Sequence, residues 1–233
     1  MKIEKYVDPQ IIDLKTECLN LEEQFNELTI EKSELEKLLS DFNNRNAVEL
    51  GELTIEILSL RKSKFKNDKS KFEEATKDEN DYREYYNQEK KKQIINITSY
   101  EKEELKKKFR KCSILCHPDK VSDEYKEEAI RIFIALKAAY DSNNIDKVTE
   151  IYNELELGKF NKSKSDLVTE KEKLILSISI LQNQLKNITN EIALIKESEI
   201  YNTIINIDNW ENYFKLKKNK LELELSILKS EII

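Results

Sequence analysis

Residues 105–120 read LKKKFRKCSILCHPDK, and this stretch decides the fold of the middle of the chain. Its recurring apolar residues are Leu105, Phe109, Cys112 and Cys116. Their spacing of three or four predicts one buried stripe on an amphipathic helix of residues 99–116. Pro118 cannot continue this helix, because its ring removes a backbone donor and clashes with the preceding turn. We therefore expect His117 and Asp119 to lie in a short exposed loop.

The same helix carries a start signal and a local positive charge. Thr98 is followed three residues later by Glu101, which is the spacing of a capping box. Residues 102–120 contain seven Lys or Arg and three acidic residues, a net charge of +4. The basic surface that we expect opposite the apolar stripe consists of Lys106, Lys107, Arg110 and Lys111. Such a patch favours association with an acidic partner.

Two further amphipathic helices are predicted after the loop. The apolar stripe of the first is Ala129, Phe133, Leu136 and Tyr140. The polar run 141–144 ends that helix, and the next helix extends over about 145–155. Two amphipathic helices joined by a short loop form an antiparallel hairpin, which would bury Phe109 against Phe133 and Tyr140.

The composition favours an all-helical protein. Charged residues make up 37% of the 233 residues, and there are only two glycines and two prolines, whereas sheets and tight turns need more of both. The net charge of −6 argues against general nucleic-acid binding, which needs an excess of positive charge. No apolar run is long enough to span a membrane. Three cysteines are too few for a disulfide framework, which predicts a cytoplasmic location.

A coiled-coil pattern precedes the middle of the chain. In the first 42 residues apolar positions alternate by three and four, with Lys32 where an apolar side chain is expected. The asparagine-rich run 43–46 predicts a turn, after which residues 47–60 would fold back as a hairpin. Residues 61–92 are mostly charged, which predicts a solvated helical stalk or a partly disordered segment.

A second coiled-coil pattern follows the middle of the chain. The alternation from Leu174 to Ile195 predicts a long helix, residues 202–209 predict a break, and a last helix begins near Trp210. Each arm can form its own hairpin, pair with the other arm or self-associate into a homo-oligomer, and periodicity does not choose among these.

The predicted organisation is all-α, with three parts. Residues 1–97 form a coiled-coil arm and stalk, residues 98–158 a compact helical domain, and residues 159–233 a second coiled-coil arm.

The middle of the chain resembles a J domain of the DnaJ family, in the second and third helices of that domain. The matching segments are LKKKFRKC at 105–112, HPDK at 117–120 and FIALKAAY at 133–140. The resemblance extends over roughly 98–157. The first helix of the family is altered here, because Tyr85-Tyr86 is not followed by Leu-Gly. The Gly/Phe-rich linker and the zinc region of full-length DnaJ proteins are not found.

The resemblance implies a non-enzymatic co-chaperone that needs no cofactor. In that family the His-Pro-Asp loop docks on a DnaK-type chaperone (heat-shock protein 70) and stimulates its ATP hydrolysis. The chaperone-binding residues that carry over are His117, Pro118, Asp119 and Lys120 in the loop, with Lys106, Lys107, Arg110 and Lys111 on the helix. A rigid proline loop would lose little entropy on binding.

Other interpretations of these residues are weaker or compete directly. Cys112, Cys116 and His117 lack the fourth ligand of a tetrahedral metal site, and both cysteines belong to the stripe expected to be buried. No nucleophile is positioned beside His117 and Asp119, so the sequence does not favour an enzyme. The alternative function is a coiled-coil scaffold whose J-like hairpin no longer engages a chaperone. Nucleic-acid binding by the basic surface is a third possibility.

Overall fold

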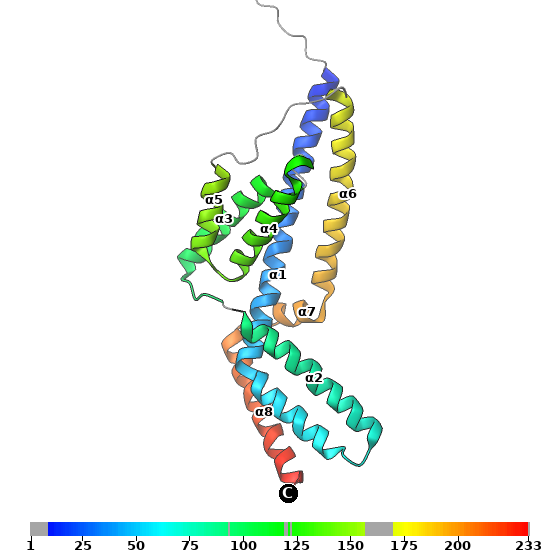
Figure 1. Ribbon diagram of the computed structural model, residues 1–233, viewed down its shortest axis with the longest axis vertical. Coiled ribbons are helices and arrows are strands. Elements are labelled where there is room, and N and C mark those ends of the chain that lie inside the picture. Colours follow the sequence, from blue (N-terminus) through cyan, green and yellow to red (C-terminus); the bar gives the residue numbers. More distant parts are fainter. Residues whose placement is uncertain (1–8, 93, 119–120, 122, 157–169, 233) are drawn as a thin grey trace, which may run out of the picture. The chain divides into compact units, whose positions relative to one another are not determined.

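The computed structural model describes residues 9–92, 94–118, 121, 123–156 and 170–232, and every regular element in these ranges is helical (Figure 1). The α-helices are α1 (Pro9–Lys64), α2 (Lys69–Lys91), α3 (Ser99–Cys116), α4 (Lys126–Asp141), α5 (Ile145–Glu156), α6 (Glu170–Glu197), α7 (Glu199–Ile205) and α8 (Trp210–Ile232), and Asp123–Tyr125 form one 3-10 turn. The predicted all-α fold is confirmed. No helix in the described ranges is both long and apolar enough to cross a membrane.

The chain divides into two compact units, and each unit combines stretches that are distant in sequence. The first unit contains α1 up to Lys37 together with α3, α4, α5 and α6. The second unit contains α1 from Leu38 onward together with α2, α7 and α8. Because α1 is uninterrupted, a single helix supplies residues to both units. The expected boundary at 158 lies outside the described residues.

In the first unit, α1 and α6 form a parallel coiled coil (Figure 1). The α1 seam consists of Leu14, Cys18, Leu21, Phe25, Leu28 and Leu35, and it packs on Leu174, Ile178, Leu181, Leu185, Ile188 and Ile192 of α6. Ion pairs Lys15–Glu170 (2.5 Å) and Lys196–Glu31 (2.6 Å) flank the seam and fix the parallel direction. Of the alternatives left open by the periodicity, pairing of the two arms is therefore present.

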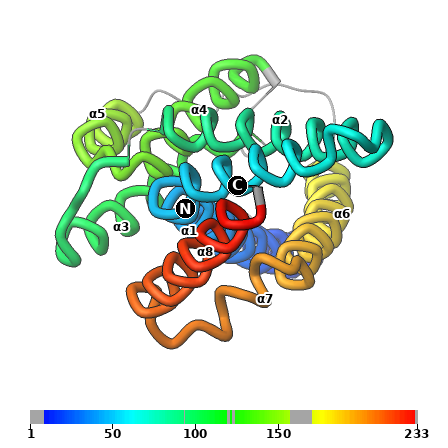
Figure 2. The backbone as a smooth tube through the Cα atoms, turned by 90° about the horizontal axis from the view of Figure 1, so that it is seen from below, coloured from blue at the N-terminus to red at the C-terminus, as the bar shows by residue number. Residues whose placement is uncertain are grey.

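Helices α3, α4 and α5 gather as one cluster beside α1 (Figure 2). The rings of Phe109 and Tyr140 stack with centroids 4.1 Å apart, and Phe133 packs against the same core, as the apolar stripes predicted. Asn143, with φ of 58°, ends α4 in the left-handed conformation that a C-terminal cap requires. Its side-chain amide donates to the carbonyl of Ile95 at 3.0 Å, which ties the start of the cluster to this turn.

The predicted turn at residues 43–46 is wrong, because α1 continues through it. Asparagine costs a helix only about 0.7 kcal/mol relative to alanine. Here the side chain of Asn44 also donates to the carbonyl of Glu89 at 2.9 Å, and Arg45 pairs with Glu211 at 2.5 Å. Phe42 and Leu50 are buried on either side of the run, so a break would expose them.

The hairpin predicted for residues 47–60 is also wrong, because these residues continue α1; the chain instead turns at residues 65–68, and α2 folds back on α1. Asp68 caps α2 by accepting a hydrogen bond from the backbone of Lys71 at 3.2 Å. Helix α2 then packs antiparallel on α1, where Tyr86 lies directly over Gly51. Glu79 is buried against Lys62, and the hydrogen bond from Lys62 lowers the pKa of this carboxyl. Residues 69–91 therefore form a helix, one of the two predictions for this segment, with Glu79, Tyr86 and Glu89 buried and most other side chains exposed.

The second unit is completed by α7 and α8. Its apolar core is formed by Phe42, Leu50, Ile57, Ile204, Phe214, Leu225 and Leu228. The predicted break falls at residues 206–209, and the last helix begins at Trp210 as expected. Arg61–Glu224 (2.5 Å) and Lys64–Glu231 (2.7 Å) show that α8 runs parallel to α1.

Gly51→Ala is expected to destabilise the protein, although alanine favours a helix by about 1 kcal/mol over glycine. The added methyl group overlaps the ring of Tyr86, and urea unfolding should show a net loss of about 1 kcal/mol or more. In a Tyr86→Ala background the ring is absent, so the same change should stabilise by about 1 kcal/mol. Stabilisation in both backgrounds would contradict the close approach of the two helices.

Candidate functional site

The helix that leads to the His-Pro-Asp loop begins and ends where the sequence predicts. The hydroxyl of Thr98 accepts from the backbone of Glu101 at 3.3 Å, and the carboxylate of Glu101 accepts from the backbone of Thr98 at 2.7 Å. This reciprocal pair is the predicted capping box, and it lowers the pKa of Glu101. The helix stops at Cys116, and His117 has extended backbone angles, as a residue before proline prefers.

His117 is less exposed than the sequence predicts. Its ring is half-buried between Phe25 of α1 (centroids 5.0 Å apart, planes at 90°) and Phe133 of α4 (5.2 Å, 73°). Both contacts are edge-to-face, an arrangement that aromatic quadrupoles favour. The sequence around His117 does not show that Phe25 of α1, which is distant in sequence, packs against its ring. Pro118 is also half-buried, whereas Asp119 and Lys120 lie outside the described residues.

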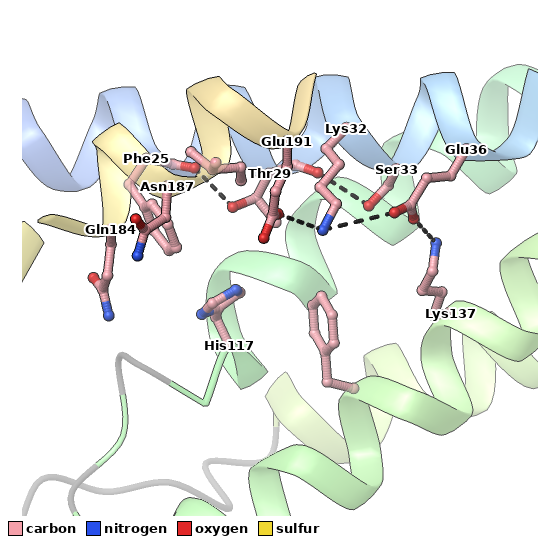
Figure 3. Close-up of a pocket in the computed structure, with 12 residues that line it drawn as sticks. Phe25, Thr29, Lys32, Ser33, Glu36, His117, Lys137, Gln184, Asn187 and Glu191 are labelled. Carbon is pink, nitrogen blue, oxygen red and sulfur yellow. Dashed lines mark hydrogen bonds and ion pairs between the residues drawn. The ribbon is translucent and has the colours of Figure 1, made fainter. Parts of the chain in front are cut away.

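His117 points into a pocket of about 330 Å³ between α1, α4 and α6 (Figure 3). The rings of Phe25, His117 and Phe133 line part of the pocket. The other lining residues are Thr29, Lys32, Ser33, Glu36, Lys137, Gln184, Asn187, Ile188 and Glu191. Lys32 bridges Glu191 (2.7 Å) and Glu36 (3.6 Å). Burial alone would lower the pKa of Lys32, but the hydrogen bond with Glu191 and the charge of Glu36 raise it.

The four predicted basic residues of α3 lie in three different environments. Lys106 and Arg110 both pair with Glu34 of α1, at 3.0 and 2.9 Å. Lys107 pairs within its own helix, with Glu104 at 3.0 Å, and this hydrogen bond raises the pKa of Lys107. Lys111 lies over the ring of Tyr152 of α5, 5.5 Å from its centroid. Only part of the basic surface therefore meets α1.

Three residues of α1 also belong to this site and were not predicted from the sequence. Phe25 is a seam residue that also contacts His117, and Glu34 and Glu36 lie beside the seam residue Leu35. Glutamates beside a coiled-coil seam usually face solvent or pair along the coil. The sequence signal nearest to them is Lys32, a charge at a seam position where an apolar side chain is expected.

Cys112 and Cys116 are buried in the core of the helical cluster, as the apolar stripe predicts. Burial raises the pKa of each thiol to about 12. Within the described ranges, no group of three His, Cys, Asp or Glu side chains is placed to hold a metal ion.

No family model, curated protein or solved structure matches this chain. The interpretation of the site therefore depends on the motif in the sequence and on the contacts described above.

Cys112 and Cys116 should resist modification by Ellman's reagent in a folded Cys18→Ser variant. A pKa near 12 leaves about a thousandfold less thiolate at pH 8 than an ordinary cysteine has. Because so little thiolate is present, we expect less than about 0.1 equivalents of thiol per chain to react with the reagent within minutes. In urea both thiols should react at once. Fast reaction of either thiol without denaturant would contradict their burial.

Proposed function

We propose that this chain is a J-domain co-chaperone that presents its His-Pro-Asp loop to a DnaK-type chaperone and stimulates ATP hydrolysis by that partner. The observation that carries the proposal is the position of the tripeptide. His117 and Pro118 directly follow α3 and precede α4, and these helices pack through the apolar stripes that the resemblance implies. The chemistry would occur on the chaperone, so this chain is not the enzyme.

The packing of the helical cluster supports the proposal physically. Leu105, Phe109 and Leu136 are almost completely buried, and each contributes about 1.5–3 kcal/mol to stability. A rigid pair of helices holds both ends of the loop, so that the loop loses little conformational freedom when a partner binds. Lys107 and Arg110, about half-exposed or more, supply positive charge that steers an acidic partner towards the loop.

Asp119→Asn in the full chain should abolish stimulation of ATP hydrolysis, measured in single-turnover assays with a panel of purified DnaK-type chaperones. The change keeps the shape of the side chain and removes the charge that would pair with the chaperone, so we expect at least a tenfold loss, as for a buried charge pair that loses one partner. The helical circular dichroism signal should not change. His117→Gln should reduce stimulation similarly.

Asp78→Asn provides the matched control, because Asp78 is exposed on α2 in the other unit. Its stimulation should equal that of the unmodified chain. If Asp119→Asn stimulates as strongly as Asp78→Asn, the loop does not act on the chaperone and the proposal fails.

The contacts of α1 favour a second candidate, a coiled-coil scaffold whose J-like cluster no longer engages a chaperone. Glu34 neutralises Lys106 and Arg110, and Phe25 packs on His117, so the cluster can serve as a structural attachment to the coiled coil. The scaffold candidate predicts no stimulation by any variant. A scaffold would instead depend on the coiled coil of α1 and α6. Leu181→Asp would place a charge in that buried interface and should disrupt it.

A further inference from the structure

Helix α1 contacts the proposed chaperone-binding surface at several points. The carboxylate of Glu34 forms ion pairs with both Lys106 (3.0 Å) and Arg110 (2.9 Å), so one acidic side chain bridges two basic ones on successive turns of α3. Two residues further along α1, Glu36 pairs with Lys137 of α4 at 2.5 Å. These acidic groups lie on the same stretch of helix and engage both helices of the hairpin.

The loop itself is held by the same helix. Phe25 lies against one edge of the His117 ring, and Phe133 of the hairpin lies against another. In the close-up view, His117 points into the pocket that α1 lines (Figure 3). A partner that needs this imidazole must therefore displace Phe25 or approach beside it.

Helix α1 supplies the acidic group that the proposed chaperone partner would otherwise supply. Lys106 and Arg110, which would steer an acidic protein surface, are paired here with Glu34 of the same chain. From this coincidence we infer that α1 holds the chaperone-binding surface in a closed state, in which Glu34 and Phe25 compete with the chaperone for Lys106, Arg110 and His117. This inference rests on the proposed function and adds regulation to it.

The closed state is weak enough to open. Side chains of Lys106 and Arg110 remain 35% and 47% exposed, and exposed ion pairs each shift an equilibrium by only about two- to fivefold. The pocket of about 330 Å³ beside His117 shows that α1 and the hairpin are not fully packed together. Opening must break the ring contact of Phe25 with His117 and the ion pairs of Glu34 and Glu36 with the hairpin.

The test compares two variants of the full chain. Glu34→Gln/Glu36→Gln removes the charges that α1 presents to the hairpin, while both side chains keep their size. Glu31→Gln removes a similar charge from α1, but Glu31 pairs with Lys196 of α6 and not with the hairpin. The double variant should reach half-maximal ATPase stimulation at a concentration about three- to tenfold lower than the unmodified chain, since three weak ion pairs with the hairpin are lost. Glu31→Gln should stay within about twofold of the unmodified chain, as expected for an exposed pair elsewhere.

A second readout reports the closed state without any chaperone. His117 is the only histidine in the chain, so its ring protons give a single resolved set of NMR signals. Ring currents of Phe25 shift these signals in the closed state, and the double variant should move them towards the values of an unstacked histidine. Glu31→Gln should leave them in place.

The outcomes separate the two proposals. If the chain stimulates ATP hydrolysis but the double variant changes neither the half-maximal concentration nor the His117 signals, the closed state is refuted and the proposed function stands. If the double variant shifts the His117 signals but leaves the concentration for half-maximal stimulation unchanged, competition between α1 and the chaperone is refuted. If no variant stimulates any chaperone, the proposed function fails, and the closed state as a regulatory device fails with it.

Discussion

The structure depends on the burial of one apolar seam that runs along α1. A helix with apolar side chains at alternating spacings of three and four must bury them against another helix. Helix α6 covers the seam around Phe25 in the first unit, and α8 covers it around Leu50 in the second. Each buried large side chain contributes about 1.5–3 kcal/mol, which exceeds the cost of about 0.7 kcal/mol for each asparagine in the run 43–46. The helix therefore remains continuous where local propensity favours a turn.

Helix α1 contributes to both the coiled coil and the candidate site. Residues of α1 that face α6 stabilise the coiled coil, and those on the adjoining side meet the hairpin that carries His117. Phe25 takes part in both, because it belongs to the seam and also touches the imidazole ring. A change that loosens the coiled coil near this residue would consequently alter the surroundings of the loop. Structural support and access to the loop are thus connected through one aromatic side chain.

Local signals made the helical cluster predictable from the sequence. The stripe of α3, its capping box and the proline after His117 act within a few residues of one another, and the structure confirms each of them. The environment of His117 was not predictable, because it depends on Phe25, which is distant in sequence. The hairpin predicted for residues 47–60 was wrong for a related reason. Asparagines in 43–46 gave a stronger local signal than Asp68, but tertiary contacts with α2 and α8 decide the outcome.

One ion pair inside the coiled coil restricts how α1 and α6 can align. Lys32 occupies a seam position and is half-buried against Glu191. If α6 slid along α1 by one heptad, the residue opposite Lys32 would be Gln184 or Ser198, and neither carries a charge. The ammonium group would then keep Glu36 of its own helix but lose Glu191, and an ion pair with such a half-exposed partner contributes about 0.2–1 kcal/mol. Lys32 therefore weakens the apolar seam locally but favours one alignment of α1 with α6.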